Sequence, residues 1–260
     1  MRHCRLAFLI VLSSFFPAYS DEAAPPRDVS AELRTIVVQS GVPALIAGIV
    51  GKDGLIALGA AGVRRSGSPS MITKNDEVHL GSCTKAMTAT VIAMLVEDGT
   101  LSWNDPLGGA FPELRETMNA KWQRATLPQL LMHASGAPAD LHFDGLWDRL
   151  WSSNDPPPEQ RMELVRAVLA RPPEADPGAK FIYANAGYAI AGAMAERAAA
   201  IQWEDLVRQR LFVPLGMTSA GFGAPGTPDR VNQPRGHREN GKSVEPGHDA
   251  DNPPAIAPAA

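Results

Sequence analysis

The longest helical pattern of the chain opens with the segment His79-Leu80-Gly81-Ser82-Cys83-Thr84-Lys85 and continues to Leu95. Apolar residues recur in this pattern at helical spacing with alanines between them, so we predict a closely packed, buried helix over residues 82–95. Free backbone N–H groups and the positive end of the helix dipole lie at the start of a helix. Both would stabilise an oxyanion that develops beside Ser82.

Lys85 follows Ser82 by three positions, so the two side chains would lie on one helix face, one turn apart. The lysine amine could then accept the proton of the serine hydroxyl. A purely structural interpretation is also open, because serine often caps helices and lysine is common on their surfaces. The small, apolar residues around Lys85 favour the catalytic interpretation.

Tyr183-Ala184-Asn185 is the second chemically informative segment, and it lies between a Pro-Gly turn and another helical pattern. Tyr183 offers a phenol that can carry a proton, and Asn185 offers an amide that both donates and accepts hydrogen bonds. The structural alternative is a tyrosine packed on the core beside an asparagine that caps the helix.

The remaining elements are predicted from periodicity and turn residues. A hairpin of strands over residues 42–50 and 55–63 surrounds the turn Lys52-Asp53-Gly54. Residues 21–29 read as a loose lead-in, and residues 248–260 read as an extended loop. Further helices are predicted over residues 31–39, 127–132, 162–170, 186–200 and 203–212. We expect one domain over residues 21–260, divided into an N-terminal helix and hairpin (21–75), a mainly helical region with the site (76–222) and a loop-rich tail (223–260).

Residues 1–20 are predicted to be a signal peptide. Arg2 and Arg5 precede an apolar run over residues 6–16, and small residues at Ala18 and Ser20 suit a signal peptidase. The alternative, a membrane anchor, is disfavoured because a run of about eleven residues is too short to span a bilayer. We therefore expect an exported protein, periplasmic or secreted, without a stable membrane anchor.

The composition excludes several classes of function. The net charge is -4 and the sequence contains no basic run with interleaved aromatic residues, so nucleic acid is not an expected partner. His237 and His248 lack the spacing of metal ligands, and no glycine-rich phosphate loop is present, so no metal or other cofactor is predicted. Once Cys4 leaves with the signal peptide, Cys83 remains alone, and we expect its side chain to point into the core. We expect a monomer.

Four ordered strings resemble the serine β-lactamase and penicillin-binding-protein superfamily, in particular its class C branch with the related esterases and D-amino-acid peptidases. The strings cover residues 79–88 (HLGSCTKAMT), 130–138 (LLMHASGAP), 177–188 (PGAKFIYANAGY) and 214–217 (PLGM). The resemblance runs from about residue 30 to residue 260. It implies an α+β fold of the β-lactamase/transpeptidase type, with a helical lobe packed on an antiparallel sheet.

The resemblance also implies an acyl-enzyme mechanism. Ser82 would attack a carbonyl, Lys85 and Tyr183 would manage its proton, and which of the two is the base stays open. Asn185 would hold Lys85 or an amide of the substrate, and the Ser82 N–H would form half of an oxyanion hole. His133 is interpreted as a packing or hydrogen-bonding residue of the second string. The implied substrate is a β-lactam, an ester or a D-amino-acid peptide, thus a small molecule or a peptidoglycan-like compound.

The sequence departs from the family pattern in one respect. Members carry a third motif, Lys or His followed by Ser or Thr and then Gly, on a strand that offers the second oxyanion N–H. No such string follows Asn185; Lys242-Ser243 lacks the glycine. We therefore expect a chain truncated at its C-terminus, with an incomplete sheet. A catalytically impaired remnant or fragment is the alternative to an active hydrolase.

Overall fold

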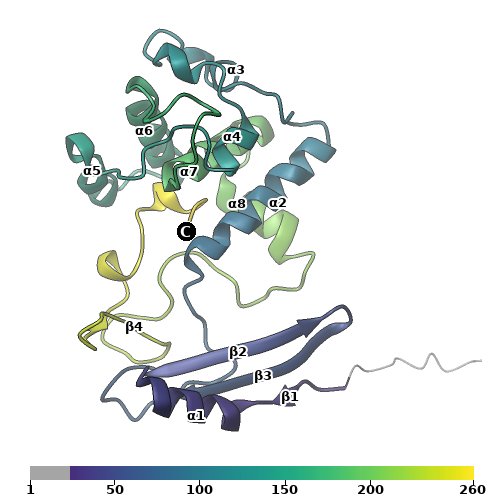
Figure 1. Ribbon diagram of the computed structural model, residues 1–260, viewed down its shortest axis with the longest axis vertical. Helices are drawn as coiled ribbons and strands as arrows, with labels where there is room; N and C mark the ends of the chain where they lie inside the picture. The colour runs from purple at the N-terminus through teal and green to yellow at the C-terminus, as the bar shows by residue number, and fades with distance from the viewer. Residues whose placement is uncertain (1–23) are drawn as a thin grey trace, which may run out of the picture.

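The computed structural model describes residues 24–260, so the predicted signal peptide lies outside the described residues. Figure 1 shows a small sheet with one helix at one end of the molecule and a lobe of helices at the other. The strand order is β1-β3-β2, and β2 pairs antiparallel with β3 as the predicted hairpin. The elements at this end are β1 (Arg27–Asp28), α1 (Ser30–Ser40), β2 (Ala44–Gly51) and β3 (Gly54–Gly62).

The strand β1 corrects the prediction of a loose lead-in, because Arg27 and Asp28 pair in parallel with β3. Gly59 of β3 explains how the lead-in comes so close. A Cβ atom at this position would lie 2.7 Å from the backbone at Val29 and Ser30. Close backbone approach is one of the physical reasons for glycine inside a strand. The sequence before α1 therefore belongs to the sheet.

The helical lobe begins with a 3₁₀ turn, Gly81–Cys83, that leads directly into the first long helix. The helices predicted at 82–95, 127–132, 186–200 and 203–212 are present, with the last one ending in a π-helical turn. The helix predicted to start at Met162 begins five residues earlier, since prolines fit the first turn of a helix. The lobe contains α2 (Thr84–Glu97), α3 (Leu107–Ala110), α4 (Leu127–Leu131), α5 (Leu146–Ser152), α6 (Pro157–Ala170), α7 (Asn185–Ala199) and α8 (Trp203–Val207).

The helix α7 forms the centre of the lobe, and every residue from Ala186 to Glu196 is buried. Small residues allow its neighbours to approach on several sides. A Cβ atom at Gly187 would lie 3.1 Å from the carbonyl oxygen of Leu130, and one at Gly192 would lie 2.5 Å from the ring of Pro258. Because α7 contacts α2, α4 and α6, it fixes the helices that carry the predicted site residues relative to one another.

The sheet and the lobe have separate cores. The buried residues Ala57 and Ala61 of β3 belong with α1, and they are not part of the apolar cluster of the lobe. The α+β class is confirmed, and α1 supplies the main helical contacts of the sheet. Polar contacts hold the loop that follows β3: Arg64 binds Asp76 through two hydrogen bonds of 2.6 and 2.7 Å, and its carbonyl accepts one from the Arg235 N–H of the tail.

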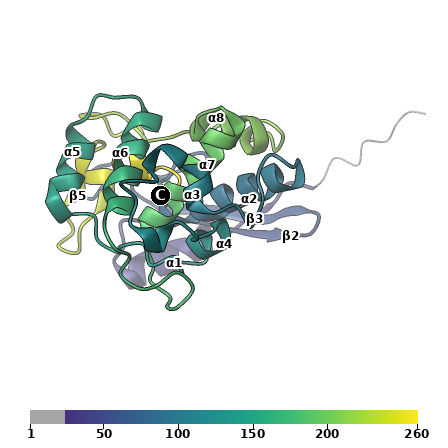
Figure 2. The same cartoon turned by 90° about the horizontal axis from the view of Figure 1, so that it is seen from above.

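The tail, residues 223–260, contains short elements and a buried end. It was predicted as loop, and most of it is irregular. However, Ala255, Ile256 and Ala259 are fully buried against the lobe. Figure 2, seen from above, shows the C-terminus in the middle of the helices. The tail contains β4 (Gly236–His237), β5 (Ser243–Val244) and the 3₁₀ turns His248–Ala250 and Pro254–Ile256. Within residues 24–260, no helix has the length and apolar character needed to cross a membrane.

Candidate active site around Ser82

Ser82 lies in the 3₁₀ turn that leads into α2, where its side chain is exposed. The turn depends on Gly81, which adopts a left-handed φ of +53° that other residues rarely adopt. Within the part of the chain that the structure describes, the Ser82 N–H has no hydrogen-bond acceptor. The hydroxyl and this N–H are therefore both available to a substrate at the start of α2.

The four residues predicted for the site come together. The Tyr183 hydroxyl donates a hydrogen bond to Ser82 Oγ at 2.7 Å. Lys85 Nζ lies 3.3 Å from the same oxygen. Asn185, the first residue of α7, accepts a hydrogen bond from Lys85 Nζ at 2.7 Å. Helical spacing brings Lys85 to Ser82, and the packing of α7 on α2 brings the other two residues.

Lys85 is buried at 7% exposure and donates to a third acceptor that the sequence gave no reason to expect. This acceptor is the backbone carbonyl of Ala259, at 2.9 Å from Nζ. The ammonium also lies 4.7 Å from the ring centroid of Tyr183 and 5.4 Å from that of Tyr188. Three oxygen acceptors and two aromatic rings thus hold one amine in a single orientation.

The phenol of Tyr183 is shifted toward its ionised form. Burial by itself would raise the pKa of Tyr183, but the Lys85 ammonium and the hydrogen bond with Ser82 together lower this pKa below the ordinary value. The neighbouring Tyr188 shows the opposite: burial first, and then the proximity of Tyr183, raise its pKa. The pKa values of two tyrosines five positions apart are therefore shifted in opposite directions. Tyr183, which contacts Ser82, ionises more readily than Tyr188.

His133 holds the backbone beside Tyr183, which agrees with the hydrogen-bonding role expected of it. Its Nδ1 accepts a hydrogen bond from the Ala184 N–H at 3.1 Å, and its carbonyl accepts one from the Ile182 N–H at 2.7 Å. The imidazole lies 4.4 Å from the Tyr183 ring, centroid to centroid. Burial, together with the Lys85 charge, lowers the pKa of His133. A neutral imidazole suits its position as acceptor.

Cys83 does not point into the core as predicted; it is exposed. The prediction assumed that an α-helix starts at Ser82, but the α-helix starts at Thr84 and the preceding 3₁₀ turn aims the side chains differently.

In residues 24–260, no group of three or more metal-ligating side chains could hold an ion.

The tail forms a wall of the site through further hydrogen bonds to the lobe. The Thr88 hydroxyl donates to the carbonyl of Pro258 at 2.7 Å and accepts from the indole of Trp203 at 3.1 Å. The buried guanidinium of Arg161 donates to the carbonyl of Pro254 at 3.1 Å. These contacts fix the backbone that carries the Ala259 carbonyl.

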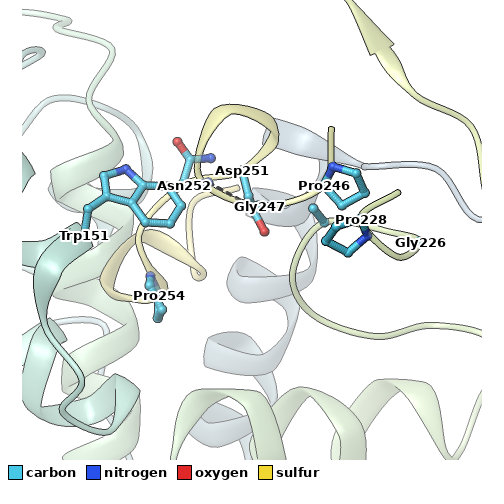
Figure 3. Close-up of a pocket in the computed structure, with 9 residues that line it drawn as sticks. Trp151, Gly226, Pro228, Pro246, Gly247, Asp251, Asn252 and Pro254 are labelled. Carbon is cyan, nitrogen blue, oxygen red and sulfur yellow. Dashed lines mark hydrogen bonds between the residues drawn. The ribbon is translucent and has the colours of Figure 1, made fainter. Parts of the chain in front are cut away.

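A cavity of about 330 Å³ lies elsewhere, between α5 and the tail, and neither Ser82 nor Tyr183 lines it. Figure 3 shows Asp251 and Asn252 on the tail, with Trp151 on one side of them and Pro228 and Pro246 on the other. The Asn252 N–H donates to Asp251 Oδ1 at 2.7 Å. Ser82 and Tyr183 are exposed side chains, and this hollow is separate from them.

Known proteins resemble this chain in both sequence and fold. The family model Beta-lactamase matches residues 29–260. Penicillin-binding protein 4 from Amycolatopsis lactamdurans is 28% identical over 159 residues, which is 61% of this chain and 39% of that protein. The D-alanine carboxypeptidase AmpC from Burkholderia cenocepacia superposes with a TM-score of 0.63 at 25% identity, over 88% of this chain and 56% of that one. The D-amino acid amidase from Ochrobactrum anthropi SV3 gives a TM-score of 0.66 at 23% identity, over 87% and 62%.

The chain is shorter than the proteins that it matches. It spans 39% of the penicillin-binding protein and 56% of the carboxypeptidase. Its fold is nevertheless that of the β-lactamase/transpeptidase group over almost all of the described residues. The resemblance that the sequence suggested is confirmed at the level of family and fold.

Proposed function

Because this chain belongs to the Beta-lactamase family, we propose that it is an exported serine hydrolase that forms an acyl ester on Ser82. The observation that carries the proposal is the convergence of two proton carriers on one hydroxyl. Tyr183 Oη and Lys85 Nζ lie 2.7 and 3.3 Å from Ser82 Oγ. Nucleophilic catalysis requires a base within hydrogen-bond reach of the nucleophile, and a third group that orients the base.

Ser82 Oγ bonds to the carbonyl carbon of the substrate, and its proton passes to the oxygen of Tyr183 or the nitrogen of Lys85. The Ser82 N–H at the start of α2 stabilises the resulting oxyanion. When the tetrahedral intermediate breaks its C–N or C–O bond, the leaving group takes up that proton and the acyl group stays on Ser82. Water then adds to the ester, the acid product leaves, and the serine hydroxyl is restored.

The substrate class that we propose is an acyl-D-amino-acid peptide, with β-lactams and simple esters as alternative acyl donors. The supporting observations are the family, the name of the D-alanine carboxypeptidase with which the chain superposes, and the exposure of the site. Tyr183 is 47% exposed and Phe181, two residues earlier, is 68% exposed. An open surface of this kind leaves room for an extended peptide on either side of Ser82.

The test is covalent labelling of the purified chain with a fluorescent penicillin, followed by mass spectrometry of the labelled peptide. We expect one adduct on the peptide that contains Ser82, and no adduct in Ser82→Ala. The control variant Ser40→Ala lacks an exposed hydroxyl on α1, outside the helical lobe that carries Ser82. It should be labelled like the unmodified protein. An adduct that persists in Ser82→Ala would overturn the nucleophile assignment.

Substrate class is tested with a peptide that ends in D-Ala-D-Ala, its L-Ala-L-Ala counterpart, nitrocefin and p-nitrophenyl acetate. Release of D-alanine without release from the L,L peptide is the expected result. The catalytically impaired alternative rests on the third motif, which would supply a second oxyanion donor and which no string between Asn185 and Ala260 matches. Loss of one such donor costs roughly 3–4 kcal/mol of transition-state stabilisation. A folded chain that neither labels nor hydrolyses any of the four compounds would favour that alternative.

A further inference from the structure

His79 lies two residues before the 3₁₀ turn of the nucleophile and makes a hydrogen bond with each of its ring nitrogens. The Gly81 N–H donates to His79 Nδ1 at 3.0 Å. His79 Nε2 lies 3.0 Å from Asp251 Oδ1 on the tail. Gly81 is a neighbour of His79 in the sequence, whereas Asp251 is 172 positions away from it. One side chain therefore connects the turn that carries Ser82 with the tail.

The first of these bonds defines the tautomer of the second. A backbone N–H can only donate, so the Nδ1 that faces Gly81 has to be the unprotonated nitrogen. The proton of the neutral ring is then on Nε2, where it donates to the carboxylate of Asp251. The carboxylate is itself held in place, because its Oδ1 also accepts from the Asn252 N–H at 2.7 Å. The side chains of His79 and Asp251 are 32% and 16% exposed.

Both ends of this connection bear on the reacting groups. On one side, Gly81 has a φ of +53° and directly precedes Ser82, so the direction of its N–H is coupled to the direction of the nucleophile's turn. On the other side, Asp251 lies eight residues before Ala259, whose carbonyl orients Lys85. The segment between them is fastened to the lobe at Pro254 and Pro258. The orientation of the Lys85 amine relative to Ser82 thus depends on two segments that His79 connects.

Resting on the acyl-serine function proposed above, we propose that His79 is a positioning residue for Ser82. The neutral imidazole links the Gly81 turn to Asp251. It thereby fixes the position of the Ser82 hydroxyl relative to the Ala259 carbonyl, which orients Lys85. His79 does not touch the reacting atoms. It acts on the acylation rate because small displacements of reacting groups, about 1 Å, can cost about 10²-fold in rate.

Two substitutions separate the two bonds of His79. An asparagine amide reaches about as far as Nδ1, so His79→Asn keeps an acceptor for the Gly81 N–H and loses the bond to Asp251. A glutamine amide reaches about as far as Nε2, so His79→Gln keeps a donor for Asp251 and loses the acceptor for Gly81. Each variant is combined with Asp251→Ala, and the second-order rate of Ser82 acylation by fluorescent penicillin is measured.

We expect Asp251→Ala to lower the acylation rate about 10- to 100-fold in the native sequence, in line with a displaced nucleophile. The same change should add a further loss in His79→Gln and almost none in His79→Asn, because interacting residues give non-additive effects. His79→Ala and Asp251→Ala together should cost no more than His79→Ala alone. Equal losses from Asp251→Ala in the native, His79→Gln and His79→Asn backgrounds would overturn the proposal.

A matched control uses another histidine–aspartate pair, His142 and Asp140, whose atoms lie 2.6 Å apart with both side chains mostly exposed. Substituting this pair by alanine should leave the acylation rate unchanged. Thermal unfolding of every variant is measured alongside. A lower Tm with an unchanged acylation rate in Asp251→Ala would assign the bond to stability alone and overturn the positioning role.

Hydrogen–deuterium exchange of the peptide that contains residues 79–86 gives a second readout that needs no reaction. We expect faster exchange at this peptide in Asp251→Ala and His79→Asn, and unchanged exchange in Asp140→Ala. If the native chain is not acylated but these exchange rates change, the proposed function fails while the connection through His79 stands. Unchanged exchange in Asp251→Ala would show that the connection itself is not made.

Discussion

At the scale of single residues, Tyr183 and Tyr188 form a natural comparison, since both rings lie near Lys85 but only one hydroxyl reaches Ser82. The hydroxyl of Tyr188 donates to the carbonyl of Leu131 at 2.9 Å. The pKa of Tyr183 is lowered, and that of Tyr188 is raised. A phenolate that accepts the Ser82 proton should therefore come from Tyr183.

We expect the acylation rate of the native chain to rise with pH through the lowered pKa of Tyr183, below the ordinary value of 10.0. The sign follows because a base acts in its deprotonated form, which grows as pH increases. Tyr183→Phe should lower the rate about 10²- to 10⁴-fold and remove this rise. Tyr188→Phe keeps its ring and should keep the profile. A rise that survives in Tyr183→Phe would point to Lys85 as the base.

The candidate residues of the site could be named from short strings, but their geometry could not. Ser82 and Lys85 are related by helical spacing, and Tyr183 and Asn185 by the start of α7. The carbonyl of Ala259 carries no side-chain signature, and it reaches Lys85 from 174 positions away. The same holds for Asp251 beside His79. Backbone acceptors and long-range pairs depend on the packing of the tail, which periodicity does not describe.

At the scale of elements, the loop that follows β3 is held by Arg64 and Asp76. Their bidentate pair is partly buried, with the Asp76 side chain 3% exposed. Burial would raise the pKa of Asp76, but hydrogen bonds from Arg64 and Thr73 lower it below the ordinary value of 3.8. The carboxylate form is therefore more stable in the folded chain than in the unfolded one.

We expect Asp76→Asn to lower the free energy of unfolding by about 2 kcal/mol near neutral pH, the scale of hydrogen bonds to a charged group. Because the folded pKa lies below the unfolded one, this stabilisation is present above 3.8 and is lost as pH falls through the folded pKa. Urea unfolding at pH values from neutral to acidic measures it. Asp249→Asn, in an exposed pair with Arg238, should change stability by less than about 1 kcal/mol. A difference that persists undiminished in acid would contradict the assignment.

Element boundaries were predicted well where the signal is local. The hairpin follows from its alternation and turn, and α7 follows from a long run of small residues. The strand β1 was missed because it is only two residues long and has no periodic pattern of its own. Its pairing with β3 depends on a close backbone approach that Gly59 permits. The helix α6 starts five residues before the predicted Met162, because the first turn of a helix accepts prolines.

At the scale of the whole molecule, one buried cation holds four segments together. The Arg161 side chain is fully buried on α6 and binds Glu196 of α7 at 2.7 Å and Glu204 of α8 at 3.0 Å, in addition to the Pro254 carbonyl of the tail. Burial opposes the charge, but the two carboxylates outweigh it and raise the pKa of Arg161. The cluster therefore contains two buried acids and one base.

Arg161→Met should lower the free energy of unfolding by about 3–5 kcal/mol, because it leaves two buried carboxylates without their cation. Combining it with Glu196→Gln and Glu204→Leu should restore most of the loss, since an amide oxygen at position 196 still accepts from the Trp203 N–H. Arg197→Met, in an exposed pair with Glu113, is the control and should cost little. Urea unfolding measures all of these; a triple variant no more stable than Arg161→Met would refute the charge explanation.

The bond between Lys85 and the carbonyl of Ala259 has a consequence for biosynthesis. A ribosome releases the chain from its amino end, so the serine, the amine and the phenol all emerge before the oxygen that orients the amine. A nascent chain that has reached only the first turn of α8 already holds the chemical groups, yet it lacks the wall that arranges them. The contact that orients the amine is therefore made only after translation has passed residue 259.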